Sequence, residues 1–323
     1  MAADVDMSAL PTICQARRQS LEDQWRLESF VFSRQYNPDQ VEQLRTMYIR
    51  VGPYTFQFQK QLGKGSYGVI YLLKDRLQNV YLALKCTDSD EEVAISQLLL
   101  ESGCQVLREQ QVGKPIHDPL QNKSWNYNFF MELAEGTLVE YLPLLLNTRP
   151  DLAGNDPERH RHLLEVGESI RLQMLCLYNL NDNLVYTDAR LENVLFKCDN
   201  PEELNSVRFL LGDLGSAVRD SVSGLYIASY VPYEYKNMNG QFPLNTRAEK
   251  EAVLAWGLGI LLLGFLAHGT VEYRRMAYDQ IQLLTRVQYM FLYNQLENAF
   301  GPDVATLLQL NPGARRSIFS PLV

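Results

Sequence analysis

The sequence predicts an α+β fold, because strand patterns early in the chain are followed by a long apolar helix near its end. Three early segments have strand-like patterns, at residues 55–60, 69–73 and 80–86. Apolar and polar residues alternate along the first of them, as expected for a half-buried strand. Residues 253–267 carry no charge and fit a helix that is buried on all sides.

The composition is that of an ordinary globular protein. The chain has 323 residues, enough for one large domain or two lobes, with 46% hydrophobic and 21% charged residues. Its net charge of −8 argues against nucleic acid as a partner, because nucleic-acid binding favours a basic patch. We therefore expect no nucleic-acid partner.

The cysteines and the N-terminus favour an intracellular protein, cytoplasmic or nuclear. The five cysteines are scattered and form no C-x-x-C pair, which predicts free thiols and no zinc site. The first residues are polar and acidic, unlike a secretory signal. Residues 253–267 are shorter than the roughly 20 that a membrane span needs. We expect no membrane contact, although a span over residues 253–271 is the alternative.

Residues 1–52 are expected to form an N-terminal extension. Residues 23–32 and 39–48 have helix-like patterns, and Val41, Leu44 and Tyr48 would share one face of the second helix. The alternatives are a disordered tail and a helical arm that braces the domain or contacts a partner.

A glycine-rich turn follows the first predicted strand. Gly63, Gly65 and Gly68 lie in a G-x-G-x-x-G pattern between two strands, where backbone amides can approach phosphates closely. A dinucleotide-binding turn would instead open a helix. Lys85 ends the third strand and is a candidate phosphate ligand.

The segment of residues 186–195 carries three side chains suited to phosphoryl transfer. Asp188 can accept a proton from a hydroxyl, Arg190 can hold a phosphate and Asn193 can bind a metal ion through its amide oxygen. Phosphoryl transfer depends mainly on positioning and charge neutralisation, which these groups supply.

From about Tyr54 to the C-terminus the chain resembles a eukaryotic-type protein kinase. The matching landmarks occur in the family's order: the glycine-rich turn, Lys85, the hinge approach at residues 126–133, Asp188 with Asn193, Asp213-Leu214-Gly215, Tyr233-Glu234 and residues 311–315. The resemblance implies two lobes with ATP between them. Residues 53–133 would form the small β-rich lobe and hinge, and residues 134–323 the larger helical lobe.

The resemblance also implies a role for each site residue. Asp188, Lys85, Arg190 and Glu92 would be catalytic, with Lys85 holding ATP phosphates and paired to Glu92. Asn193 and Asp213 would hold Mg²⁺. ATP would be bound by Leu62, Gly63, Gly65, Gly68, Ile70, Ala83, Lys85, Met131, Glu132, Leu133 and Leu195.

The partner of Lys85 has three candidates. Glu92 with Ile95 and Leu98 is similar to the corresponding helix of the casein kinase one group, but the short gap from Lys85 leaves Glu91 and Glu101 open. The same group favours serine or threonine in a protein substrate as the acceptor. The compact, divergent sequence is also similar to kinases of large DNA viruses.

Departures from the family pattern support an alternative, a pseudokinase that acts as an ATP-binding scaffold or regulatory binding module. Thr187 replaces the arginine of the usual His-Arg-Asp triplet, and Leu254 replaces a buried aspartate. A kinase of small molecules fits less well, because Glu234 and Arg315 match an ion pair typical of protein kinases.

Overall fold

The computed structural model describes residues 38–51, 54–64, 68–77, 81–102, 109–111, 116–118, 120–149, 157–180, 184–198, 207–218, 221–223, 232, 241–267 and 286–323. The chain divides into two compact units, with the division after Glu135. We call the described residues before the division the first unit and the part from Gly136 to Val323 the second unit.

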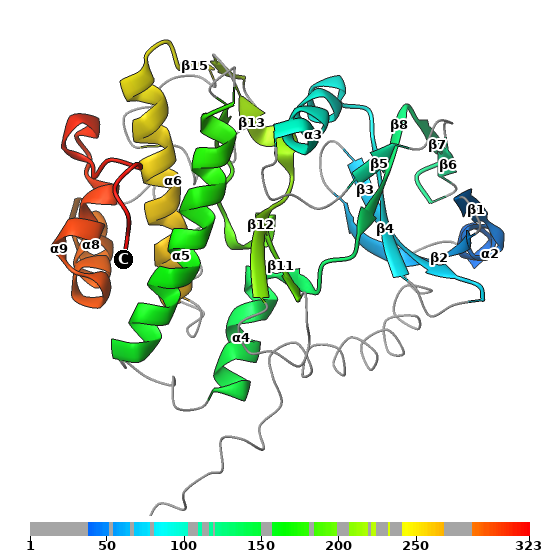
Figure 1. The fold of residues 1–323 in the computed structure, drawn as a ribbon, viewed down its shortest axis with the longest axis horizontal. Helices are drawn as coiled ribbons and strands as arrows, with labels where there is room; N and C mark the ends of the chain where they lie inside the picture. Colours follow the sequence, from blue (N-terminus) through cyan, green and yellow to red (C-terminus); the bar gives the residue numbers. More distant parts are fainter. Residues whose placement is uncertain are drawn as a thin grey trace, which may run out of the picture. The chain divides into compact units, whose positions relative to one another are not determined.

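The first unit is built on a six-stranded antiparallel sheet in the order β1-β2-β3-β4-β8-β5 (Figure 1). The strands are β1 (Tyr48–Val51), β2 (Tyr54–Lys64), β3 (Gly68–Asp75), β4 (Tyr81–Thr87), β5 (Glu109–Gln111) and β8 (Tyr127–Glu132). All three predicted strands are present as β2, β3 and β4, each a little longer or shifted by a residue. Short connections between β1, β2, β3 and β4 favour an antiparallel arrangement of these four strands.

Both faces of this sheet are covered. One face packs with Leu44 of α2 (Pro38–Thr46) and with Leu120 and Trp125 around a hairpin of β6 (Ile116–Asp118) and β7 (Lys123–Trp125). The other face packs with Val93 of α3 (Asp90–Ser102). Asp118 is buried and accepts hydrogen bonds from the Tyr71 hydroxyl and the Trp125 indole, which fixes the hairpin to the sheet.

Residues 38–51 belong to the first unit, where α2 packs on the sheet and β1 joins it. β1 pairs with β2 along its whole length, and Leu44 is only 1% exposed. The predicted helix of residues 39–48 ends at Thr46, and Tyr48 lies in β1 with 63% exposure instead of sharing the helix face. The helical pattern of residues 23–32 lies outside the described residues.

The second unit contains the long helices. Its helices are α4 (Leu138–Thr148), α5 (Pro157–Tyr178), α6 (Arg247–Ala267), α8 (Arg286–Phe300) and the short α9 (Pro302–Ala305). Figure 1 shows α5 and α6 side by side, and α8 contacts both. The described part of this unit also contains short 3-10 turns. Two lie next to strands, η3 (Leu191–Asn193) and η4 (Leu214–Ser216), and two lie near the C-terminus, η7 (Thr306–Leu308) and η8 (Pro312–Ala314).

Helix α6 is buried along most of its length, as the uncharged segment predicts. Every residue from Ala252 to Phe265 is buried. Among the helices that the structure describes, none is both long and apolar enough to cross a membrane. The segment therefore serves as the central helix of the second unit.

Short strands complete the second unit. β9 (Gly136–Thr137), β11 (Val194–Cys198) and β12 (Val207–Leu211) form one sheet. β10 (Val185–Tyr186) pairs with β13 (Ala217–Val218), and β14 (Ser221–Ser223) pairs with β15 (Gln241–Pro243).

The prediction that all cysteines are free thiols is wrong for two of them. Cys86 in β4 is a buried free thiol, but Cys176 on α5 and Cys198 at the end of β11 are disulfide-bonded. Spacing along the chain could not reveal this, because a disulfide depends on distance in the folded molecule.

Candidate active site

Asp188, Arg190 and Asn193 form one connected group in the second unit. The Asn193 amide donates a hydrogen bond of 2.6 Å to the Asp188 carboxylate, and the Arg190 Nε lies 3.3 Å from the same oxygen. The backbone closes a turn, because the Asn193 N–H donates to the Arg190 carbonyl at 3.0 Å. The three polar residues that the sequence selected in this segment therefore meet at one carboxylate.

The surroundings of Asp188 raise the pKa of its carboxyl above the ordinary value. Burial is the main cause, and the negative charges of Asp213 and Glu192 add to it. Arg190 and the hydrogen bond from Asn193 act in the opposite direction. A raised pKa makes a carboxylate a stronger base.

Two strand pairs bring Asp213 to this group. β10, which leads to Asp188, pairs with β13, which follows Asp213. β11, which follows Asn193, pairs with β12, which precedes Asp213. At the end of the second pair, the Gly212 N–H donates to the Asn193 carbonyl at 2.7 Å. Asp213 itself has φ 49°, a left-handed conformation that aspartate tolerates better than most residues.

Tyr186 is a supporting residue whose role sequence reasoning did not identify. It is fully buried, and its hydroxyl donates a hydrogen bond of 2.7 Å to the carbonyl of Gly212, directly before Asp213. A buried tyrosine normally finds a partner for its hydroxyl. The available signal was a tyrosine in the apolar run before Asp188.

In the first unit, Lys85 forms an ion pair with Glu92. Lys85 is on β4, and Glu92 lies in the first turn of α3 with 3% exposure. Of the three glutamates left open by the sequence, Glu92 is the one that the structure pairs with Lys85. The side chains of Glu91 and Glu101 lie outside what the structure describes.

Most of the residues expected to contact adenine share one face of the first unit's sheet. Ala83 and Met131 are buried in a cluster with Val93, and Ile70 and Leu133 pack against it. Lys85 is next to them, since its cross-strand neighbours are Ile70 and Phe129. The sheet therefore presents an apolar surface beside the Lys85–Glu92 ion pair.

The remaining expected nucleotide contacts have different settings. Leu62 is 40% exposed near the end of β2, and Glu132 is half-buried at the end of β8. Leu195 is half-buried on β11 and belongs to the second unit. Gly65 lies outside the described residues.

Gly63 and Gly68, at the ends of the turn, differ in their surroundings. A Cβ at Gly63 would meet no atom within 4 Å. A Cβ at Gly68 would lie 2.4 Å from the Cys86 carbonyl oxygen, so Gly68 also allows β3 to approach β4.

The positions that depart from the kinase pattern are buried in the second unit. Thr187 is 5% exposed and Leu254 is fully buried in α6. Arg315 donates to the carbonyls of Gln309 and Ala252 and lies over the Trp256 ring. Its predicted partner Glu234 lies outside the described residues.

Comparison with known proteins gives distant kinase relatives. No protein-family model matches the chain. The Aurora kinase of Saccharomyces cerevisiae is 23% identical over 214 residues, which cover 65% of this chain and 52% of that protein. The Aurora/IPL1-related protein kinase 2 of Caenorhabditis briggsae is 23% identical over 221 residues, covering 65% of this chain and 63% of the relative. The chain thus spans between half and two thirds of the curated relatives' length.

A solved structure agrees with these relatives. The ROP18 kinase domain, solved in complex with AMP-PNP and sucrose, superimposes with a TM-score of 0.50 at 15% identity, covering 85% of this chain and 80% of that one. The chain has a protein-kinase fold. The predicted α+β kinase-like fold is therefore confirmed, and the relatives support a place in the protein kinase superfamily. They do not support a particular likeness to casein kinase one or to viral kinases, which stays a prediction.

Proposed function

We propose that the chain is a protein kinase that transfers the γ-phosphate of ATP to a serine or threonine hydroxyl of a protein. The observation that carries this proposal is the connected group of Asp188, Arg190 and Asn193, which β11 and β12 join to the segment of Asp213. A base, a phosphate-binding cation and two metal ligands in one place are what phosphoryl transfer requires.

Asp188 would orient the acceptor hydroxyl and take its proton. Its raised pKa suits that role, because a general base works best when its pKa approaches the working pH. Arg190 would stabilise charge on the transferring phosphate, since a guanidinium binds phosphate through two parallel hydrogen bonds. The contact between Arg190 and Asp188 would keep both groups in position until the substrate binds.

ATP would be held by residues of the first unit. Lys85, oriented by Glu92, would bind the α- and β-phosphates. Adenine would lie against the apolar surface of Ile70, Ala83, Met131 and Leu133. Backbone groups of Glu132 and Leu133 would bind the adenine edge, and Leu62 with the glycine turn would cover the nucleotide.

Asn193 and Asp213 fit Mg²⁺ as ligands. Carboxylate and amide oxygens are the hard donors that Mg²⁺ prefers, and one or two carboxylates plus substrate phosphates usually suffice. Within the described parts of the chain, no cluster of three or more His, Cys, Asp or Glu side chains forms a metal site. The Asn193 amide nitrogen is used by Asp188, so the amide oxygen is left for the metal.

The acceptor and the cellular setting belong to the same proposal. The names of the two curated relatives are those of kinases, one of them a protein kinase, which supports a protein as acceptor. The choice of serine or threonine follows from the sequence resemblance, and the intracellular location from the scattered cysteines without a C-x-x-C pair.

A pseudokinase is the second candidate. Thr187 and Leu254 stand where the kinase pattern has charged residues, and both are buried, so the catalytic segment lacks the two charges of that pattern. Such a protein would bind ATP through Lys85, oriented by Glu92, without transferring phosphate.

Radiolabelled phosphate transfer from ATP with Mg²⁺, on the chain itself and on generic protein substrates, separates the two candidates. Lys85→Met and Asp213→Asn should each lower the rate about a hundredfold or more, because each removes a charge that stabilises the transition state. Lys74→Met, on β3 of the same sheet, is the matched control and should retain activity. Wild-type protein whose melting temperature rises with Mg-ATP but which transfers no phosphate would instead support the pseudokinase.

A further inference from the structure

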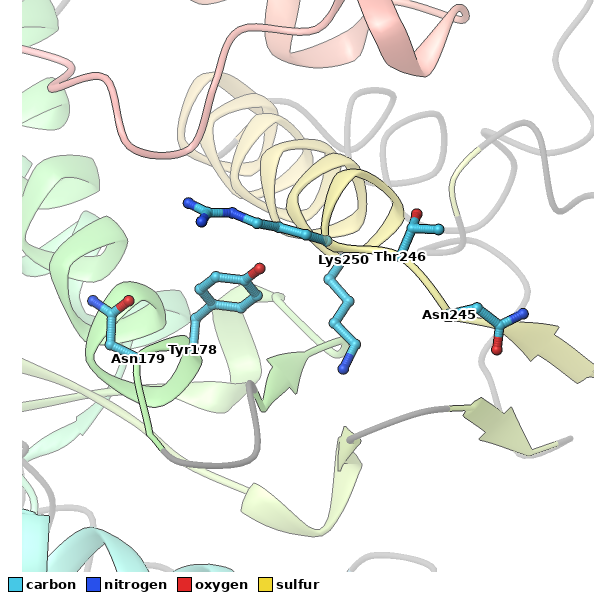
Figure 2. A pocket seen from close by; sticks show the side chains of 6 residues that line it. Tyr178, Asn179, Asn245, Thr246 and Lys250 are labelled. Carbon is cyan, nitrogen blue, oxygen red and sulfur yellow. The ribbon is translucent and has the colours of Figure 1, made fainter.

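A polar pocket lies in the second unit where α5 ends and α6 begins. It has a volume of about 270 Å³ and is lined by Tyr178, Asn179, Asn245, Thr246, Arg247 and Lys250 (Figure 2). None of these six residues belongs to the set assigned to phosphoryl transfer. Figure 2 shows the Tyr178 ring and the Lys250 side chain on neighbouring helices beside the same space.

The lining is rich in hydrogen-bond donors. Each of the six side chains carries an N–H or O–H group, and two of them are cations. No carboxylate is among the described residues that line the pocket. Burial raises the pKa of Tyr178, with the charge of Glu251 adding to it, so its hydroxyl stays protonated at neutral pH and can donate.

The carboxylates nearest in sequence are engaged in contacts of their own. Glu249 accepts from the Thr246 N–H at 2.8 Å, and the Thr246 hydroxyl accepts from the Glu249 N–H, which closes the start of α6 as a capping box. Glu251 accepts from Arg247. The helix start is therefore satisfied internally, and the pocket offers side-chain donors rather than the N–H groups of a helix end.

Several lining residues are held in place before any ligand arrives. Arg247 lies over the Phe319 ring, and Tyr178 makes an edge contact with the same ring. Lys250 is only 8% exposed although it lines the pocket. Side chains that are already ordered lose little entropy on binding, which favours affinity.

We propose that this pocket binds a phosphate monoester or a similar tetrahedral oxyanion. One arginine and one lysine line the pocket together with hydroxyl and amide side chains, and donors of these kinds bind phosphate oxygens. The volume is below the roughly 300–1,000 Å³ of sites that enclose whole small molecules. The pocket therefore fits a single phosphate group on a carrier that remains outside, or the free anion.

Calorimetric titration of the full chain tests the proposal with three probes: inorganic phosphate, a phosphoserine peptide and the same peptide without phosphate. Arg247→Gln should weaken binding of the phosphate-bearing probes about tenfold or more, because a charge-assisted hydrogen bond is lost. Arg161→Gln is the matched control, since Arg161 also pairs with a glutamate four residues later on a helix and is likewise exposed. It should leave binding unchanged.

The same experiment distinguishes a phosphate carried by a protein from a free phosphate anion. Tighter binding of the phosphopeptide than of inorganic phosphate assigns the pocket to a protein-borne phosphate, and equal binding assigns it to a free anion. Lys250→Gln serves as a second variant, with melting temperatures to verify folding. The proposal is overturned if folded Arg247 and Lys250 variants bind both phosphate probes as the wild type does, if neither probe binds, or if Arg161→Gln weakens binding equally.

Discussion

At Asp188, two opposing influences act on one carboxyl group. Burial and the nearby Asp213 favour its neutral form, whereas Arg190 and Asn193 favour the carboxylate. The balance leaves the pKa above the ordinary value of an aspartate. Arg190 thus has two proposed effects, on the transferring phosphate and on the base itself.

The pH dependence of catalysis separates these effects. As a base, Asp188 must be deprotonated, so activity rises with pH through its pKa. Arg190→Gln removes the largest influence that lowers this pKa, so the acidic limb of the kcat/KM profile should move to higher pH. Arg190→Lys keeps the positive charge, so the acidic limb of its profile should lie close to that of the wild type. If the variant is slower but the acidic limb of its pH profile does not shift, Arg190 acts only on the transferring phosphate.

The sequence identified the motif residues but not all their partners. Asp188, Asn193 and Lys85 follow from a fixed order of motifs along the chain. The partner of Lys85 does not follow from that order, because the glutamates at positions 91, 92 and 101 all fit a helix after β4. The position of Glu92 on the buried side depends on where α3 begins, which is Asp90 in the structure. The Tyr186 hydrogen bond to Gly212 spans 26 residues, a distance that no local pattern reports.

At the scale of elements, α6 shows how close packing depends on glycine. A Cβ added at Gly259 would lie 2.7 Å from a Leu308 methyl group and 3.1 Å from the Leu307 Cβ. The small residue therefore lets η7 pack directly against the helix. Gly257 similarly faces Ala189 of the segment that carries Asp188.

Gly259→Ala should destabilise the protein by about 1 kcal/mol. The helix gains up to about 1 kcal/mol when alanine replaces glycine, but overpacking a buried contact costs about 1–3 kcal/mol. Urea unfolding measures the difference. A Leu308→Ala background removes the closest contact and leaves the one with the Leu307 Cβ at 3.1 Å, so the same change should cost less there, and a double-mutant cycle should show coupling. Equal effects in both backgrounds would mean that Gly259 and Leu308 do not interact.

Element boundaries were harder to predict than elements. The uncharged run indicated a helix over residues 253–267, yet α6 begins at Arg247, and the capping pair of Thr246 and Glu249 was the missed signal. Residues 39–48 fit a helical period, but four residues of β1 are too short to show strand alternation. Pairing with β2, a tertiary contact, decides the conformation of this segment.

At the scale of the second unit, hydrogen bonds hold the C-terminal segment, residues 318–322, against helix α5. Arg171 is 4% exposed and makes two hydrogen bonds to Glu168, of 2.7 and 2.6 Å, and one of 2.8 Å to the Ile318 carbonyl. Glu168 also accepts from the Leu322 N–H at 2.8 Å. The hydrogen bonds to Ile318 and Leu322 join residues 147 and 154 positions apart, so the sequence could not predict them.

Glu168→Gln should therefore destabilise the protein by roughly 3 kcal/mol, because Arg171 stays buried without its carboxylate. Glu165→Gln is the control on the same helix, since its ion pair with Arg161 is exposed and should be worth about 0–1 kcal/mol. Urea unfolding near pH 7 compares the two variants. Similar small losses for both would mean that the ion pair does not hold the C-terminal segment.

The pH dependence of the same variants gives a further check. Burial alone would raise the pKa of Glu168, but the hydrogen bonds from Arg171 and Leu322 outweigh it and the folded pKa is lowered. A carboxyl with a lowered folded pKa stabilises the protein above its unfolded pKa, which is about 4.3 for glutamate. That stability is lost as the pH falls through the lower folded value. The gap between wild type and Glu168→Gln should therefore be full at pH 7 and shrink below about pH 4, whereas a gap that stays constant would point to lost packing rather than lost charge.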